Sequence, residues 1–264
     1  MRTIAVIQAR MTSTRLPGKV LMAVLGRPML GYQVERVARA GRLDGIVLAT
    51  TTNATDDPVA EFAAGAGVPV FRGSESDVLG RVAAAAASQD ATHVVRLTGD
   101  CPLSDPEIVD AVVERLTDGR PEVDFVTNGI PRSWPVGVDA EAMTMAALAR
   151  ADAEAVDAYD REHVTPFLYR NPERFRLANL PAPSDFSGHR WTLDEPADFE
   201  LIRRILAALY PTRPAFGWRD VLALVEAHPE WRAVNRGVAQ KTRLYEAEAM
   251  RGFQSTTKYE VSGE

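Results

Sequence analysis

The segment from Ile4 to Lys19, IAVIQARMTSTRLPGK, joins an apolar run to a small, polar, cationic loop. The apolar run predicts a buried strand. The loop is rich in small residues whose backbone N–H groups can approach an anion closely. These small residues are Thr12, Ser13, Thr14 and Gly18. Because Arg10, Arg15 and Lys19 add positive charge, the loop indicates a polyphosphate site, with an ordinary solvated basic loop as the alternative.

The loop matches neither of two common nucleotide-binding motifs. A Walker A loop needs G-x-x-x-x-G-K-[ST], but Lys19 is followed by Val20. A dinucleotide fingerprint needs G-x-G-x-x-G directly after the strand, and this pattern is absent there. Both classes are therefore excluded at this position.

Two acidic residues stand where a metal could be bound beside phosphates. Asp100 comes shortly after the strand-like run 93–98, and ligands of open α/β sheets bind at the carboxyl ends of parallel strands. Asp194 ends another apparent strand, 189–193, before Pro196. Mg²⁺ beside phosphates uses one or two carboxylates and keeps several waters. Each Asp also has a structural alternative, because such residues often cap turns and helices.

Two further polar groups have open interpretations. Asp139 and Glu141 stand at i, i+2, so they share a face if the segment is extended. They could bind substrate hydroxyls or a metal, or form a solvated strand face. Arg72, Ser74 and Asp77 follow a short apparent strand and could contact a nucleobase or ribose. Alternatively, this segment only caps the next helix.

The sequence does not favour a zinc site or a cysteine nucleophile. His163, in DREHVTP, has no other His or Cys at metal-ligand spacing. Cys101 has no nearby residue in the sequence that would act as its base, so a small buried residue is expected. A G-x-S-x-G nucleophile elbow is also absent.

Strand-like and helix-like runs alternate through the first half of the chain, which is typical of βαβ units with helices on both faces of a mostly parallel sheet. The expected strands are 4–7, 45–51, 68–71, 93–98, 123–127, 175–180 and 189–193. The expected helices are 29–40, 55–66, 77–88, one that starts at 106, 157–169, 196–209 and 218–227. Asp105 is expected to cap the helix that Pro106 opens.

The length of 264 residues fits one large α/β domain or two small ones, and we expect a single domain over residues 1–237. Within it, residues 120–185 are punctuated by prolines and are expected to form a lobe for substrate binding and, in a homodimer, for subunit contact. Residues 238–264 are expected to be a polar C-terminal tail, with disorder after about Phe253.

Composition and charge limit the classes of partner. The net charge of −6 argues against a broad nucleic-acid surface. The single cysteine excludes an intrachain disulfide and fits a reducing compartment. The sequence shows neither a signal-peptide pattern nor an apolar run of membrane-spanning length. We therefore expect a cytoplasmic protein that binds neither nucleic acid nor membranes.

Six ordered motifs, from Arg2 to about Ile205, resemble the cytidylyltransferase family of the spore-coat polysaccharide biosynthesis protein F type. They are QARMTSTRLPGKVL, TTNATDDP, FRGSESDVLGR, RLTGDCPLSDPEIVD, DREHVTPFLY and WTLDEPADFEL. That family is similar to the Kdo and N-acylneuraminate cytidylyltransferases, which activate acidic sugars as CMP conjugates. The resemblance implies a three-layer α/β/α Rossmann-like nucleotidyltransferase fold with a mostly parallel mixed sheet, and the use of CTP and Mg²⁺.

The resemblance also assigns roles to residues. The expected nucleotide-binding residues are Gln8, Ala9, Arg10, Ser13, Arg15, Lys19, Arg72, Ser74, Asp77 and Thr98. Arg10, Lys19 and Asp100 are expected to be catalytic. Asp100 and Asp194 are expected to hold Mg²⁺. The expected acceptor-binding residues are Arg132, Asp139, Glu141 and His163.

The implied reaction is attack of an acceptor oxygen on the α-phosphorus of CTP, which transfers CMP to a sugar, sugar acid or related small molecule and releases pyrophosphate. Such a product would serve polysaccharide, glycoconjugate or secondary-metabolite biosynthesis. The family often has Arg where this chain has Val136, and Arg132 could supply that cation. Two alternatives stay open. One is a metal-dependent glycosyltransferase, which should carry Asp-x-Asp where this chain has GDCP, and the other is a non-catalytic nucleotide-binding regulator.

Overall fold

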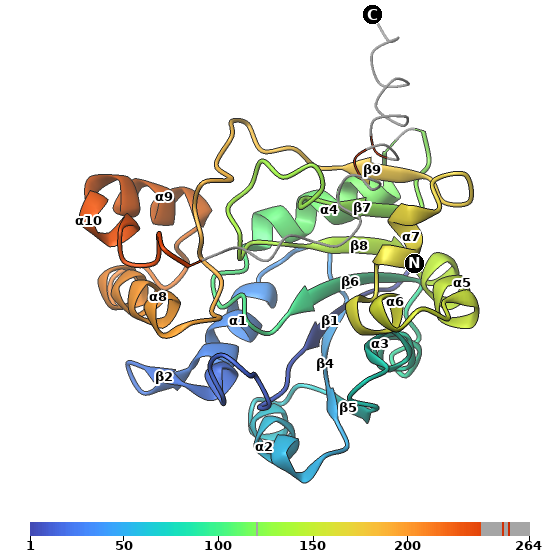
Figure 1. Ribbon diagram of the computed structural model, residues 1–264, viewed down its shortest axis with the longest axis horizontal. Helices are drawn as coiled ribbons and strands as arrows, with labels where there is room; N and C mark the ends of the chain where they lie inside the picture. The colour runs from blue at the N-terminus through green and yellow to red at the C-terminus, as the bar shows by residue number, and fades with distance from the viewer. Residues whose placement is uncertain (120, 239–249, 251–252, 254–264) are drawn as a thin grey trace, which may run out of the picture.

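The computed structural model describes residues 1–119, 121–238, 250 and 253. A seven-stranded sheet with the order β5-β4-β1-β6-β8-β7-β9 runs through its middle (Figure 1). The strands are β1 (Thr3–Gln8), β4 (Gly45–Thr51), β5 (Val70–Gly73), β6 (His93–Thr98), β7 (Phe125–Thr127), β8 (Glu141–Thr144) and β9 (Leu177–Asn179). Only β8 runs antiparallel to its neighbours, since the other pairings in this sheet are parallel. The expected mostly parallel mixed sheet is confirmed.

Helices cover both faces of the sheet. They are α1 (Met29–Val37), α2 (Asp57–Gly65), α3 (Val78–Ala87), α4 (Pro106–Thr117), α5 (Met145–Glu154), α6 (Ala158–His163), α7 (Pro166–Arg170), α8 (Pro196–Leu209), α9 (Trp218–Ala227) and α10 (Pro229–Arg232). Two short 3₁₀ helices (Lys19–Leu21 and Ala54–Asp56) and a hairpin of β2 (Ala23–Val24) and β3 (Arg27–Pro28) complete the described elements.

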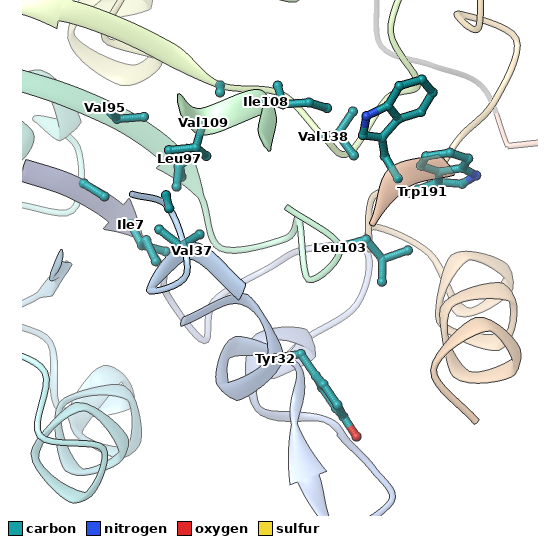
Figure 2. Close-up of a cluster of buried hydrophobic side chains, with 14 of the residues drawn as sticks. Ile7, Tyr32, Val37, Val95, Leu97, Leu103, Ile108, Val109, Val138 and Trp191 are labelled. Atoms are coloured by element: carbon teal, nitrogen blue, oxygen red, sulfur yellow. The ribbon is translucent and has the colours of Figure 1, made fainter. Parts of the chain in front are cut away.

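The alternation of side chains along β1 creates one hydrophobic cluster on each face of the sheet. Ala5 and Ile7 pack in a cluster with α1, α4, α8 and α9, whereas Ile4 and Val6 pack in a second cluster with α3, α5 and α7. Figure 2 shows part of the first cluster, in which Ile7 and Leu97 from the sheet lie near Val37 of α1. The three-layer α/β/α architecture follows from this double burial.

Several boundaries match the sequence-based predictions. The strands 45–51 and 93–98 and the helices 196–209 and 218–227 are found with those bounds. Asp105 caps α4 as expected, because its carboxylate accepts the N–H of Glu107 at 2.9 Å. β8, α5, α10 and the β2–β3 hairpin were not predicted.

The single helix expected over 157–169 is wrong. The structure has two short helices there, because Val164 has a positive φ of 73°, which does not continue a helix, and Pro166 opens a new one. The break sets α6, which ends at His163, apart from α7.

The strand expected over 189–193 is also wrong. This segment makes an isolated bridge, Val136 to Arg190, and divides its backbone hydrogen bonds between two loops. The N–H of Trp191 donates to the carbonyl of Val136 at 2.6 Å, and the N–H of Leu193 donates to the carbonyl of Asp100 at 2.8 Å. The segment is therefore a strap that fastens the loop before β8 to the loop after β6.

The predicted polar tail, 238–264, falls outside the described residues except for three positions. Of these, Phe253 is buried, and its ring centroid lies 6.4 Å from that of Phe125. The predicted disorder after Phe253 concerns residues that the structure does not describe. Across the described part of the chain, no helix has the length and apolar character needed to cross a bilayer.

Candidate active site

A cavity of about 770 Å³ opens at the carboxyl ends of β1 and β6. Gln8 and Thr98, the last residues of these strands, face each other in register and both line it. Most of the predicted nucleotide-binding residues meet here. They are Gln8, Ala9, Arg10, Ser13, Arg15, Lys19 and Thr98, and the predicted catalytic Asp100 joins them.

The loop between β1 and Lys19 is closed by its own backbone. The N–H of Gly18 donates to the carbonyl of Met11 at 2.9 Å, and Gly18 has φ 70°, a conformation that favours glycine. The N–H of Met11 donates to the buried carboxylate of Asp56 at 2.6 Å. This second contact fastens the loop to the start of α2. These contacts fix the position of Lys19 in the lining of the cavity.

Lys19 lies between the two predicted metal ligands. Its Nζ donates to Oδ2 of Asp100 at 3.0 Å and to Oδ1 of Asp194 at 2.8 Å. The Lys19 side chain is only 10% exposed. Burial alone would lower the pKa of the ammonium, but the two carboxylates outweigh it and raise the pKa above its ordinary value. The Lys19 side chain therefore stays protonated and positively charged at neutral pH.

Asp194 also forms ion pairs with two arginines. Arg15 and Arg190 each place a guanidinium nitrogen 3.0 Å from its Oδ2. Burial would raise the pKa of the Asp194 carboxyl, but Lys19 and these arginines hold it below its ordinary value. The two predicted metal ligands and two cations of the loop, Arg15 and Lys19, thus belong to one charge cluster.

This donor set fits Mg²⁺. Asp100 and Asp194 direct carboxylate oxygens at one point, which the Lys19 ammonium occupies, and Mg²⁺ would replace the ammonium there. No group of three or more metal-ligating side chains occurs in the described part of the chain. Two carboxylates suffice for Mg²⁺, because phosphates and water complete its six oxygen ligands.

Two glycines permit the close approach of the segments that carry these residues. A Cβ at Gly99 would lie 2.8 Å from the Cβ of Ala9, so any side chain there would push the ends of β1 and β6 apart. Gly137 has φ 106°, and a Cβ there would lie 2.4 Å from the backbone N of Thr192. Gly137 therefore lets the strap lie directly on the loop before β8.

A second cavity of about 260 Å³ adjoins the first and shares Arg96, Thr98, Asp100 and His163 with it. All four predicted acceptor-binding residues line this second cavity: Arg132, Asp139, Glu141 and His163. Arg132 forms an ion pair with Asp139, and Val136 lines the same wall. The cation that the sequence lacks at Val136 is thus present nearby on Arg132.

Arg96, which sequence analysis missed, joins the two cavities. Its Nη1 donates to Oε2 of Glu141 at 2.6 Å, and its Nε donates to Oε1 of Gln8 at 2.9 Å. Thr165 donates to the other oxygen of Glu141 at 3.1 Å. The available signal was a charged residue inside the otherwise apolar strand HVVRLT.

The structure does not place Arg72, Ser74 or Asp77 in the lining of either cavity. Arg72 donates to backbone carbonyls at the end of β4, and Ser74 accepts the N–H of Asp77. Asp77 caps α3 through the N–H of Gly80 at 3.0 Å and pairs with Arg161. Their neighbours do line the larger cavity, and these are Glu75, Ser76 and Arg81.

Cys101 is buried and lines the second cavity. Burial, followed by the charges of Asp100 and Asp139, raises the pKa of its thiol well above the ordinary value. This environment suppresses the thiolate that a nucleophile needs. The structure agrees with the prediction of a small buried residue.

The fold and the paired cavities define the class of protein: a nucleotidyltransferase. The chain belongs to the cytidylyltransferase family, whose model matches residues 4–213. It is 32% identical over 235 residues to the spore coat polysaccharide biosynthesis protein SpsF of Bacillus subtilis, a match that covers 85% of this chain and 94% of that protein.

Two solved structures are similar to this chain. One, a cytidylyltransferase from Leptospira borgpetersenii, has a TM-score of 0.84 at 32% identity and covers 92% of this chain and 100% of its own. The other, a CMP:2-keto-3-deoxy-manno-octonic acid synthetase complexed with CTP, has a TM-score of 0.61 at 19% identity and covers 79% of this chain and 99% of its own. The second likeness concerns the fold alone.

Proposed function

We propose that this protein transfers CMP from CTP to a small acceptor, with release of pyrophosphate, and that the acceptor is a sugar acid or a related anion. The observation that carries the proposal is the position of Lys19 between Asp100 and Asp194, where the larger cavity meets the smaller one. The larger cavity takes the nucleotide and the smaller one takes the acceptor. The reacting phosphorus then lies near Asp100, which lines both.

Electrostatic stabilisation and positioning carry most of the proposed catalysis. Negative charge grows on the triphosphate as pyrophosphate leaves, and Arg10, Arg15 and Lys19 are the cations of the loop that lines its cavity. Arg10 now pairs with Glu75 at 3.0 Å and Arg15 pairs with Glu195 at 3.4 Å. These arginines exchange carboxylate partners for phosphate oxygens when the nucleotide binds.

Asp100 and Asp194 would hold Mg²⁺ in the loaded enzyme, and the ion would neutralise triphosphate charge. Lys19 keeps these two carboxylates together before the nucleotide arrives. An acceptor hydroxyl would need a base, and His163 lines both cavities at their junction. A phosphate acceptor would need none.

The acceptor is proposed to be anionic because Arg96 and Arg132 line the smaller cavity, where an acceptor anion would compete with their carboxylate partners Glu141 and Asp139. SpsF is named for spore coat polysaccharide biosynthesis, which fits a sugar-derived acceptor. The acceptor's identity, the cytoplasmic location and a homodimer remain predictions.

Thermal stabilisation by each of the four nucleoside triphosphates, with and without Mg²⁺, tests this proposal without an acceptor, because a ligand that binds the native state raises Tm. CTP with Mg²⁺ should give the largest shift, and Asp100→Asn should reduce it. Arg203→Gln, on the exposed side of α8, is the control. A larger shift with a UDP- or GDP-sugar would instead indicate a glycosyltransferase. Binding of CTP without pyrophosphate release from any acceptor would indicate a regulator.

A further inference from the structure

A third cavity, of about 360 Å³, adjoins the acceptor cavity and shares Arg132 and Val136 with it. Residues of the strap, of α8 and α9 and of the segment after α10 surround it. Figure 1 shows α8, α9 and α10 grouped at one end of the molecule. This cavity is separate from the proposed nucleotide site. Of the acceptor-binding residues expected from the sequence, only Arg132 lines it.

The charge of the third cavity is one-sided. Four arginines line it, and none of the described lining residues is acidic; the arginines are Arg132, Arg190, Arg232 and Arg236. Arg190 is neutralised by Asp194 and Asp198, and Arg132 pairs with Asp139. In contrast, neither Arg232 nor Arg236 has an ion-pair partner within the described ranges. Because the whole chain carries a net charge of −6, this concentration of positive charge is a local feature.

Three buried polar groups on the cavity wall lack hydrogen-bond partners among the described residues. They are Nδ1 of His189, Nε1 of Trp191 and Nη1 of Arg132. His189 is 6% exposed and Trp191 is 1% exposed. A buried polar group without a partner costs free energy. The Trp191 and Arg132 nitrogens are donors, and Nδ1 of His189 is a donor in one of its two neutral tautomers. These groups around one cavity point to an acceptor-rich ligand.

The environment of His189 favours the neutral form of its imidazole. Burial and, next, the positive charge of Arg232 lower the pKa of its imidazole, and the nearby Glu226 only partly opposes them. Arg232 therefore acts on His189 electrostatically. The remaining walls include Leu201 and Val225, which could contact the carbon skeleton of an organic ligand.

We infer that the third cavity is a binding site for a carboxylate- or phosphate-bearing small molecule, held by Arg132, Arg232 and Arg236 with His189 and Trp191 as additional donors. The anion has two conceivable sources. It is either the far end of the acceptor, reached past Arg132, or a separate effector. A separate effector could influence the active site through a short chain of contacts. Arg190 lines the cavity and donates to Asp194, which in turn accepts from Lys19.

Binding is tested on the full chain by titration with inorganic phosphate, followed through the imidazole NMR signals of His189, which are assigned from their loss in His189→Gln. We expect a saturable shift of these signals. In Arg232→Gln the dissociation constant should rise about tenfold or more, the scale of one lost charge-assisted contact. The matched control is Arg219→Gln, an exposed arginine of α9 that pairs with Glu107 outside the cavity. A signal that does not move, or equal affinity in Arg232→Gln, would overturn the inference.

The source of the anion is then separated by pyrophosphate release, which rests on the proposed function, whereas the NMR titration does not. If the anion belongs to the acceptor, Arg232→Gln raises the acceptor's KM and leaves kcat nearly unchanged. If it is an effector, added phosphate changes kcat in the unaltered protein and has no effect in Arg232→Gln. If Arg232→Gln changes neither the acceptor's KM nor the effect of phosphate on kcat, the third cavity has no part in the reaction. That result would overturn both proposed sources of the anion.

Discussion

The ammonium of Lys19 lies 3.0 Å from Oδ2 of Asp100, although 81 positions separate the two residues in the chain. The pair is possible because the loop after β1 closes on Gly18 and the loop after β6 begins with Gly99, which permits close approach. The pair therefore brings a cation and a predicted metal ligand to one place before the substrate arrives.

Replacement of Lys19 tests this preorganisation. Lys19→Met should lower kcat/KM for pyrophosphate release by on the order of 10²-fold or more, the scale of one deleted electrostatic contact. Arg203→Met, an exposed cation paired with Glu200, should leave the rate nearly unchanged. The Tm of both variants shows whether they fold. An unaltered rate in folded Lys19→Met would remove Lys19 from the mechanism.

The sequence predicted most of this site because its residues follow strands. Gln8, Thr98 and Asp100 stand at the ends of apolar runs, and parallel strands bring such ends together. Asp194 was placed correctly for the wrong reason, since the expected strand before it is a strap whose partners are two loops. Local patterns do not reveal such long-range partners. The third cavity was missed for the same reason.

Arg72, Ser74 and Asp77 show the opposite limit of motif reasoning. Their motif predicts nucleotide contact, and their neighbours do line the cavity. The structure gives Asp77 a helix cap and an ion pair instead. A motif therefore locates a segment near a site without telling which of its side chains face the ligand.

The buried pair of Arg96 and Glu141 should matter more for stability than an exposed pair. Their side chains are 11% and 5% exposed. Glu141→Ala leaves the Arg96 charge buried without this partner, which should cost roughly 3–5 kcal/mol of unfolding free energy. Glu200→Ala, which breaks ion pairs on α8, should cost about 1 kcal/mol or less. Urea denaturation measures both. If Glu141→Ala lost activity at unchanged stability, Glu141 would be an acceptor contact and not a support for Arg96.

Asp77 should contribute a pH-dependent part of the stability. Burial would raise the pKa of its carboxyl, but hydrogen bonds from Arg161 and Gly80 and the Arg161 charge hold the pKa below its ordinary value. Because the pKa is depressed in the folded state, the stabilisation is complete above the unfolded pKa and is lost as pH falls through the folded one. Asp77→Asn should therefore be less stable than the unaltered protein near neutral pH, and the difference should shrink in acid.

The size of this effect is limited by exposure, since the Asp77 side chain is 40% exposed. The ion pair should be worth about 1 kcal/mol or less. Asp77→Ala also removes the α3 cap and should cost about 1 kcal/mol more than Asp77→Asn. Urea denaturation at a series of pH values measures all three proteins. A difference between Asp77→Asn and the unaltered protein that stays constant down to strongly acid pH would contradict the role of the carboxylate charge.

Cys101 provides a test of whether a side chain in the acceptor cavity must take part in the chemistry. Cys101 is 3% exposed, and burial and the nearby carboxylates of Asp100, Asp139 and Asp194 raise the pKa of its thiol, so the reactive thiolate is scarce at neutral pH. A disulfide reagent should therefore label the native protein far more slowly than the urea-unfolded protein. Cys101→Ala should retain most of its pyrophosphate release, because the neighbouring cations Lys19 and Arg96 are unaltered. Rapid labelling of the native thiol, or a folded Cys101→Ala protein without activity, would contradict this prediction. Either result would indicate that Cys101 takes part in the reaction.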